Sequence, residues 1–182
     1  MTGVVLGDRS LAVLPPDEIC TQIDRWRRLY DPLFELVPPH ITVAYPPFVS
    51  EEEWPAVQPA LARCLGEFSP FSIRLQGLGS FSGDSFVLWL KPQDGGNLVR
   101  IRARLEEQFP QYVRALPFDY VPHLTIGSFR SEAGLNVARE VVQAEIVPSQ
   151  FEVDELVYLS PDHRGVWCIC QRVALGPMLA DD

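Results

Sequence analysis

Two closely similar pentapeptides dominate this sequence, and each alternates as a half-buried strand does. They are Pro39-His40-Ile41-Thr42-Val43 and Pro122-His123-Leu124-Thr125-Ile126, and their histidines lie 83 positions apart. Because residues i and i+2 of a strand share a face, each copy places one imidazole beside one hydroxyl while the aliphatic residues enter a core. The preceding proline favours the extended backbone that a strand needs. The chain must therefore build a sheet around two equivalent strands.

The elements around the pentapeptides recur in one order, helix, strand, helix, strand, strand. The strand pairs match without a gap, since Phe71 and Phe86 align with Phe151 and Val166 at a constant offset of 80. Alternating residues, caps and turn signals predict the boundaries. The predicted strands are Ser10 to Leu14, His40 to Tyr45, Phe71 to Leu78, Ser85 to Leu90, His123 to Ser128, Phe151 to Leu159 and Val166 to Leu175. The predicted helices begin at Asp17, Ser50, Asn97 and Ser131.

This order predicts an α+β fold that is bilobal and duplicated. We expect two mostly antiparallel sheets that face a central groove, with helices on their outer faces. Residues 1–182 would form one domain, its lobes built by internal repeats of about 15–90 and 95–175. A chance rhythm of helices and strands is the alternative, and the gapless match together with the shared pentapeptide favours duplication.

Composition narrows the classes of function. The 182 residues are 47% apolar, enough for a packed core, and carry a net charge of −9. That sign disfavours a protein that grips a long duplex by charge, but it allows a small phosphorylated ligand held by a few donors. Lys91 is the single lysine, and Lys91-Pro92-Gln93-Asp94-Gly95 has one residue too many for the K-x-D-G motif of ATP-dependent ligases. We therefore expect no lysyl-adenylate chemistry.

The cysteines and the absence of long apolar runs bear on location. None of the four cysteines forms a C-x-x-C pair, and Cys168 and Cys170 suit a reduced core strand better than a bridge. Few cysteines in a chain of this length favour a reducing compartment. The segment Met1 to Arg9 lacks the pattern of a signal peptide, and no run approaches a membrane span. We expect a cytoplasmic monomer with no membrane partner.

Two imidazoles facing two hydroxyls suit phosphodiester chemistry that needs no metal or other cofactor. A neutral imidazole can take a proton from the attacking oxygen while an imidazolium gives one to the leaving oxygen. Threonine hydroxyls can donate to the nonbridging phosphoryl oxygens. No H-x-x-x-H or Cys/His pair predicts a metal site, and His163, the third histidine, is expected to be solvated in a turn. Coincidence is the alternative, and it is disfavoured because two of three histidines lie in matched strings.

The chain resembles the 2H phosphoesterases, a family named for two His-x-Thr motifs on a duplicated fold. The resemblance runs from Leu11-Ala-Val-Leu-Pro-Pro, through both motifs, to the closing hairpin at Trp167. The family that it resembles includes 2′-5′ RNA ligase-like proteins and RNA 2′,3′-cyclic phosphodiesterases. By this resemblance His40 is the proton donor and His123 the acceptor, with Thr42 and Thr125 holding the phosphate.

One position departs from the family pattern. Many bacterial members carry an arginine five residues after the second histidine, where this chain has Ser128, with Arg130 two residues further on. Arg130 can substitute only if its loop turns inward. Tyr45 and Phe129 flank the motifs and could stack a nucleobase, although aromatic residues at strand ends more often pack. We take Tyr45, Ser128, Phe129 and Arg130 as candidate substrate-binding residues.

The leading hypothesis is a phosphodiesterase that opens a 2′,3′-cyclic phosphate or a related small cyclic or 2′-5′ phosphodiester. Its partner would be a small nucleotide or an RNA terminus bearing a cyclic phosphate, and the reverse reaction would be 2′-5′ RNA ligation. The alternative is a binding module on the same fold that recognises a nucleotide or RNA terminus without catalysis. A third hypothesis is an enzyme that acts on a cyclic phosphodiester other than RNA.

Overall fold

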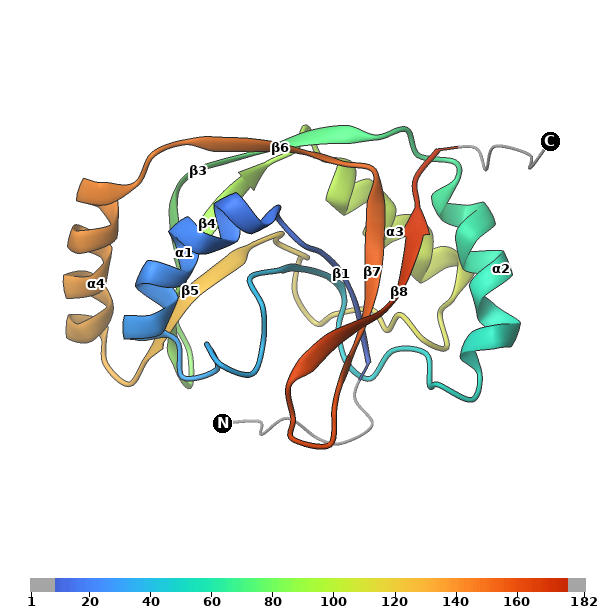
Figure 1. Cartoon of the computed structure of the whole chain (residues 1–182), viewed down its shortest axis with the longest axis horizontal. Coiled ribbons are helices and arrows are strands. Elements are labelled where there is room, and N and C mark those ends of the chain that lie inside the picture. The colour runs from blue at the N-terminus through green and yellow to red at the C-terminus, as the bar shows by residue number, and fades with distance from the viewer. Residues whose placement is uncertain (1–8, 177–182) are drawn as a thin grey trace.

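The computed structural model describes residues 9–176 and combines helices with a single curved sheet (Figure 1). The expected α+β class is confirmed, and the expectation about Met1 to Arg9 falls almost wholly outside the described residues. The strands are β1 (Ser10–Val13), β2 (Ile41–Ala44), β3 (Phe71–Phe81), β4 (Phe86–Gln93), β5 (Leu124–Phe129), β6 (Ser149–Val153), β7 (Glu155–Pro161) and β8 (Trp167–Ala174). The helices are α1 (Asp17–Tyr30), α2 (Trp54–Leu65), α3 (Asn97–Gln108) and α4 (Glu132–Glu145).

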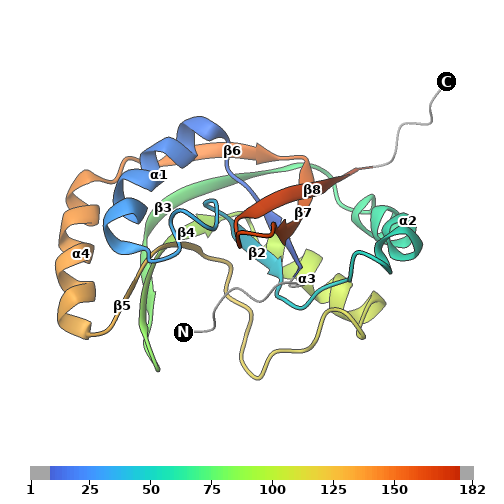
Figure 2. The ribbon, with the colours of Figure 1, turned by 60° about the horizontal axis from the view of Figure 1, so that its bottom comes forward.

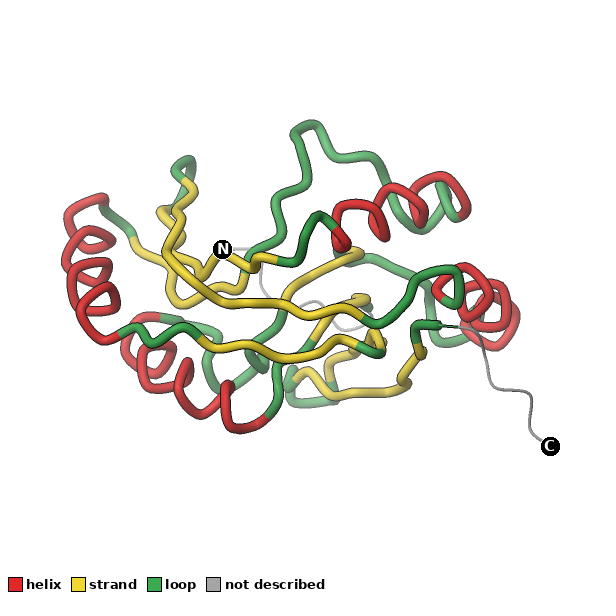
Figure 3. Tube along the Cα trace, turned by 90° about the horizontal axis from the view of Figure 1, so that it is seen from above, coloured by secondary structure: helices red, strands yellow, loops and turns green. Residues whose placement is uncertain are grey.

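The expectation of two separate sheets is wrong. All the described strands join one antiparallel sheet in the order β6-β3-β4-β5-β2-β1-β7-β8, and Figure 3 shows it as a curved layer with helices at both ends. The join is made at the centre, where β2 pairs with β5. Each half of the sheet combines strands from both expected repeats, and the duplication itself stays a prediction.

The helices cover the sheet in two groups, which Figures 1 and 2 show at opposite ends of the molecule. Helices α1 and α4 lie against β4 and β5, whereas α2 and α3 lie against each other and reach β8 and β2. One continuous core fills the space between helices and sheet, and it includes Ile41 and Leu124, both fully buried. The aliphatic residues of the pentapeptides therefore anchor the centre of the sheet, as alternation predicted. None of the helices in residues 9–176 has the length and apolar character to cross a membrane.

Local signals predicted the helix starts with mixed accuracy. Ser131 caps α4, because its Oγ accepts from the Gly134 N–H at 3.2 Å. Ser50 and Glu53 form the expected mutual contact, with Ser50 Oγ 2.6 Å from a Glu53 carboxylate oxygen. However, residues 51–53 form a turn and the regular helix begins only at Trp54. The capping box therefore orders the approach to α2 and not its first helical turn.

Two features lie where the sequence did not place them. Cys168 and Cys170 are exposed free thiols on β8, not core residues, because β8 is the last strand at one edge of the sheet. Arg27 is 2% exposed although it lies outside the apolar pattern expected for α1. Its burial is supported by polar partners, which bear on the site described next.

Candidate active site

The two His-x-Thr motifs lie on neighbouring strands at the centre of the sheet. Ile41 of β2 is paired with Leu124 of β5. Continuing this antiparallel register by one residue places Thr42 opposite His123 and His40 opposite Thr125. Opposed residues have Cα atoms about 4.5–5.5 Å apart. Since the aliphatic residues face the core, this register assigns the two imidazoles and two hydroxyls to the corners of a rectangle on the other face.

Both imidazole rings are held by the same backbone contact. His40 Nδ1 lies 2.8 Å from the Pro38 carbonyl oxygen, and His123 Nδ1 lies 2.8 Å from the Val121 carbonyl oxygen. A neutral ring that donates through Nδ1 has an unprotonated Nε2. In both motifs Nε2 is therefore the nitrogen available for proton transfer, and the residue two before each histidine orients the ring.

The two histidines differ in their electrostatic surroundings. Burial lowers the pKa of His40 below its ordinary value, opposed by the hydrogen bond to Pro38, and the charges of Arg27 and His123 lower it further while Asp31 raises it. Burial also lowers the pKa of His123, opposed by the hydrogen bond to Val121. Both rings favour the neutral state in the free protein, but only the pKa of His40 is shifted by neighbouring charges.

An aromatic wall, formed by Phe81 and Trp89, packs against His123. The ring of Phe81 meets the imidazole edge-on with centroids 4.9 Å apart, and the Trp89 ring lies 6.0 Å away. Trp89 is opposite Thr125 in the pairing of β4 with β5. Its indole fits because position 79 of the neighbouring strand is glycine, where a Cβ would collide with the ring. Gly79 is the sequence signal for this wall, since a glycine inside a strand marks a close approach.

Arg102 and Tyr120 hold β2 from behind. Arg102 is 3% exposed and donates to the carbonyl oxygens of Val43 and Arg114 at 2.9 and 2.6 Å. The Tyr120 hydroxyl donates to the Thr42 carbonyl oxygen at 2.7 Å. Tyr45 is half-buried with its ring 5.8 Å from the same guanidinium, an arrangement typical of a cation–π contact. The sequence interpretation missed Arg102 and Tyr120, because neither lies in a motif.

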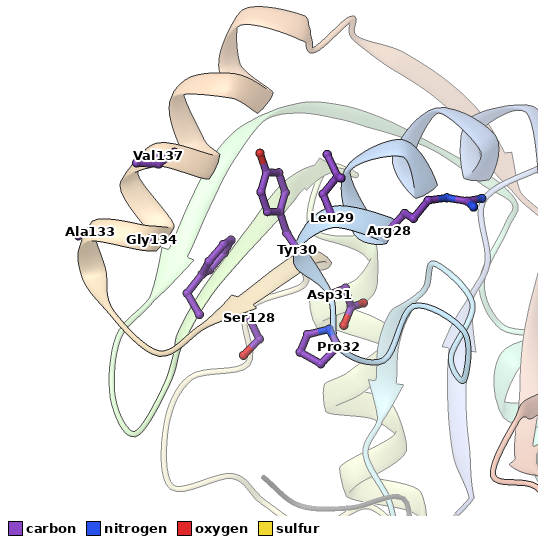
Figure 4. A pocket seen from close by; sticks show the side chains of 10 residues that line it. Arg28, Leu29, Tyr30, Asp31, Pro32, Ser128, Ala133, Gly134 and Val137 are labelled. Atoms are coloured by element: carbon purple, nitrogen blue, oxygen red, sulfur yellow. The ribbon is translucent and has the colours of Figure 1, made fainter.

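The candidates after β5 border a separate hollow of about 740 Å³, shown in Figure 4. It lies between the end of α1, the end of β5 and the start of α4, and the histidines do not line it. Ser128 and Phe129 line it together with Arg28, Asp31 and Val137. Phe129 also packs on Tyr30, with ring centroids 5.8 Å apart. Arg130 is exposed in the following bend and is not among the lining residues.

Metal ligands do not gather at this site. In the part of the chain that the structure describes, no group of three or more His, Cys, Asp or Glu side chains could hold a metal ion. The rectangle offers two imidazole nitrogens and two hydroxyls on one surface. Such a set can transfer protons and donate hydrogen bonds to an oxyanion.

Comparisons with known proteins agree with the family resemblance and the fold. The model of the 2′-5′ RNA ligase superfamily matches residues 15–165. A protein of Geobacillus kaustophilus whose name proposes a phosphoesterase is 29% identical over 169 residues, which are 92% of this chain and 95% of that one. A similarly named Bacillus mycoides protein is 28% identical over 168 residues, 92% of this chain and 96% of that one.

Solved structures show the same fold. TT0787 of Thermus thermophilus is 21% identical with a TM-score of 0.64, over 94% of this chain and 100% of that chain. LigT of E. coli, solved with 3′-AMP, is 25% identical with a TM-score of 0.60, over 93% of this chain and 98% of that chain. The family match spans most of the chain, and the fold and both His-x-Thr strands accompany it. The chain therefore belongs to the 2′-5′ RNA ligase superfamily of 2H phosphoesterases.

Proposed function

We propose that this protein is a metal-independent phosphodiesterase that opens a 2′,3′-cyclic phosphate or a related small cyclic or 2′-5′ phosphodiester. The observation that carries the proposal is the pairing of Ile41 with Leu124, because continuing this register sets the two His-x-Thr motifs side by side. The family match and the relatives named for phosphoesterases support the same reaction class.

In the proposed reaction, His123 takes a proton from water as the water oxygen bonds to phosphorus. The bond from phosphorus to one ribose oxygen breaks, and His40 gives that oxygen a proton. Thr42 and Thr125 donate to the nonbridging oxygens, where negative charge persists through the transition state. With a ribose hydroxyl in place of water, the same attack on the cyclic phosphate would form a 2′-5′ phosphodiester, and this ligation is the reverse of cleaving that diester by transesterification. The order of donor and acceptor follows the family resemblance.

The proposed substrate is a small nucleotide or an RNA terminus. The net charge of −9 opposes binding of a long polyphosphate, whereas a single phosphate needs only a few placed donors. E. coli LigT has been solved with 3′-AMP, ATP and phosphate, so small phosphorylated ligands bind a related protein. We also propose that the protein acts in the cytoplasm as a monomer.

The test is turnover of a panel of cyclic nucleotides, cyclic-phosphate-ended oligonucleotides and 2′-5′ and 3′-5′ dinucleotides in the presence of chelator. Wild type is compared with His40→Ala and His123→Ala, and the matched control is His163→Ala, which removes the exposed third histidine. Each site variant should lose about 10²–10⁴ in rate, and the control should lose none. Turnover that survives loss of His40 or His123 contradicts the proposal. Binding without turnover by wild type favours the non-catalytic alternative.

A further inference from the structure

The end of α1 and the loop to His40 are tied together by one buried guanidinium. Arg27 Nε and Nη2 donate to a single oxygen of Asp31 at 3.0 and 2.9 Å. Nη2 also donates to the Val37 carbonyl oxygen at 2.5 Å. The Asp31 side chain is 8% exposed, and its other oxygen accepts from the Leu33 N–H at 2.9 Å. Arg27 therefore closes the segment 31–37 onto the helix that precedes it.

That segment ends at the group that orients His40. Val37 is followed directly by Pro38, whose carbonyl oxygen contacts His40 Nδ1. Displacing Val37 would move this carbonyl and free the ring to rotate or to change tautomer. The second histidine, His123, is supported differently. Its ring packs against Phe81 and Trp89, and its pKa is shifted by burial and a backbone hydrogen bond and not by a charged group. The two halves of the rectangle are therefore supported by different physical means.

We propose that Arg27 and Asp31 form a positioning pair for His40, which holds its Nδ1–H on the Pro38 carbonyl and places one positive and one negative charge near its ring. The inference rests on the proposed acid–base function, but its structural part can be tested without turnover. Arg27 and Asp31 are positioning residues, because neither is placed in contact with the reacting atoms. Neither Arg27 nor Asp31 belongs to a recognisable sequence motif, since both precede the His-x-Thr strand.

The charges that face His40 come from two directions. Arg27 and Asp31 lie at the end of α1, and His123 directly precedes the paired strand β5. Asp24 binds the same guanidinium, with one oxygen 3.0 Å from Nη1, but it is not among the main groups that shift the pKa of His40. Removing the Asp31 carboxylate should lower the pKa of His40, because the remaining Arg27 charge opposes a second positive charge. Removing the Asp24 carboxylate should leave that pKa near the wild-type value.

The experiment is a proton–carbon NMR titration of the histidine rings, in which three histidines give three assignable signals. In Asp31→Asn the titration of His40 should move to lower pH. Asp24→Asn is the matched control. Equal titration of His40 in both variants, or a move to higher pH in Asp31→Asn, overturns the proposal whether or not a substrate is known.

A second variant separates geometry from charge. Arg27→Lys keeps the positive charge but loses the fork that binds Asp31 and Val37 at once. The carbon shifts of the His40 ring should then report a mixture of neutral tautomers where wild type shows one. With an active substrate, kcat should fall by up to about 100-fold with a smaller change in KM, because misplaced acids act poorly in the transition state. An unchanged tautomer in a folded variant refutes the positioning role.

Discussion

A glycine inside β5, Gly127, gives a sharp test of how α1 packs on the sheet. A Cβ added to Gly127 would lie 2.5 Å from the Tyr30 Cβ, 2.8 Å from the Tyr30 carbonyl oxygen and 3.0 Å from its carbonyl carbon. Carbon atoms in ordinary contact lie about 3.5–4.0 Å apart, so Gly127→Ala must move something by about 1 Å. What must move is mostly backbone, at the last residue of α1, and no rotamer change relieves it.

The expected cost is at the upper end of the range for overpacking, about 3 kcal/mol. For a domain of this size each kcal/mol lowers Tm by about 2–4 °C, so Gly127→Ala should lower Tm by about 6–12 °C. The measurement is thermal unfolding followed by circular dichroism. Since Tyr30 adjoins Asp31, turnover of any identified substrate should also fall below what the folded fraction accounts for.

The matched control is Gly134→Ala in the first turn of α4. There a Cβ would lie 3.4 Å from Ser131 Oγ and 3.6 Å from the nearest atom of Phe129, which is close to ordinary contact. Alanine is also the better helix former, by up to about 1 kcal/mol. The Tm of Gly134→Ala should therefore equal or exceed that of wild type. A Gly127→Ala protein that melts within about 2 °C of wild type would refute the argument that this backbone contact seats α1.

Further predictions concern the site and its support. Replacing Thr42 or Thr125 by valine keeps the shape of the side chain but removes a hydrogen-bond donor to the phosphoryl group. In steady-state assays kcat for an identified substrate should then fall by about 10²–10³. An unchanged kcat contradicts the proposed role of the hydroxyl. Burial lowers the pKa of both His40 and His123, so the bell-shaped pH profile of kcat/KM should peak on the acidic side of the ordinary imidazole value of about 6.5. For the same reason the folded state resists protonation, so its stability to urea should be full above about pH 6.5 and should decline as pH falls below that value. Arg102→Met leaves the Val43 and Arg114 carbonyls without their donor and should cost about 3 kcal/mol, seen as a lower urea midpoint.

Much of the candidate site could be proposed from the sequence, because its information is local. A pentapeptide of alternating character determines which side chains share a face, and its repetition in both copies made His40, Thr42, His123 and Thr125 stand out. The register of β2 on β5 was not predictable, since it depends on a contact between residues 83 positions apart in sequence. Alternation tells which way a side chain points but not which strand lies beside it.

The errors have the same origin. Two sheets were expected because each repeat resembles a complete unit, yet the strands that carry the motifs pair across that boundary. Cys168 and Cys170 were assigned to the core from strand alternation, but an edge strand exposes what a central strand would bury. Arg27 was overlooked because a helical pattern of apolar residues cannot reveal a buried charge whose partners lie in the following loop.

The central pairing of β2 with β5 also bears on whether a conformational step limits the rate of turnover. Where an acid and a base sit on separate lobes, a hinge has to close before chemistry begins, and that closure can limit turnover. Here backbone pairing between neighbouring strands would hold both proposed groups, His40 and His123, so the distance between them would be a property of the sheet. Solvent viscosity should therefore affect the diffusional encounter with substrate but have little effect on the later steps of turnover. Substrate selectivity should depend on the residues at the rim of the site and not on a moving lid.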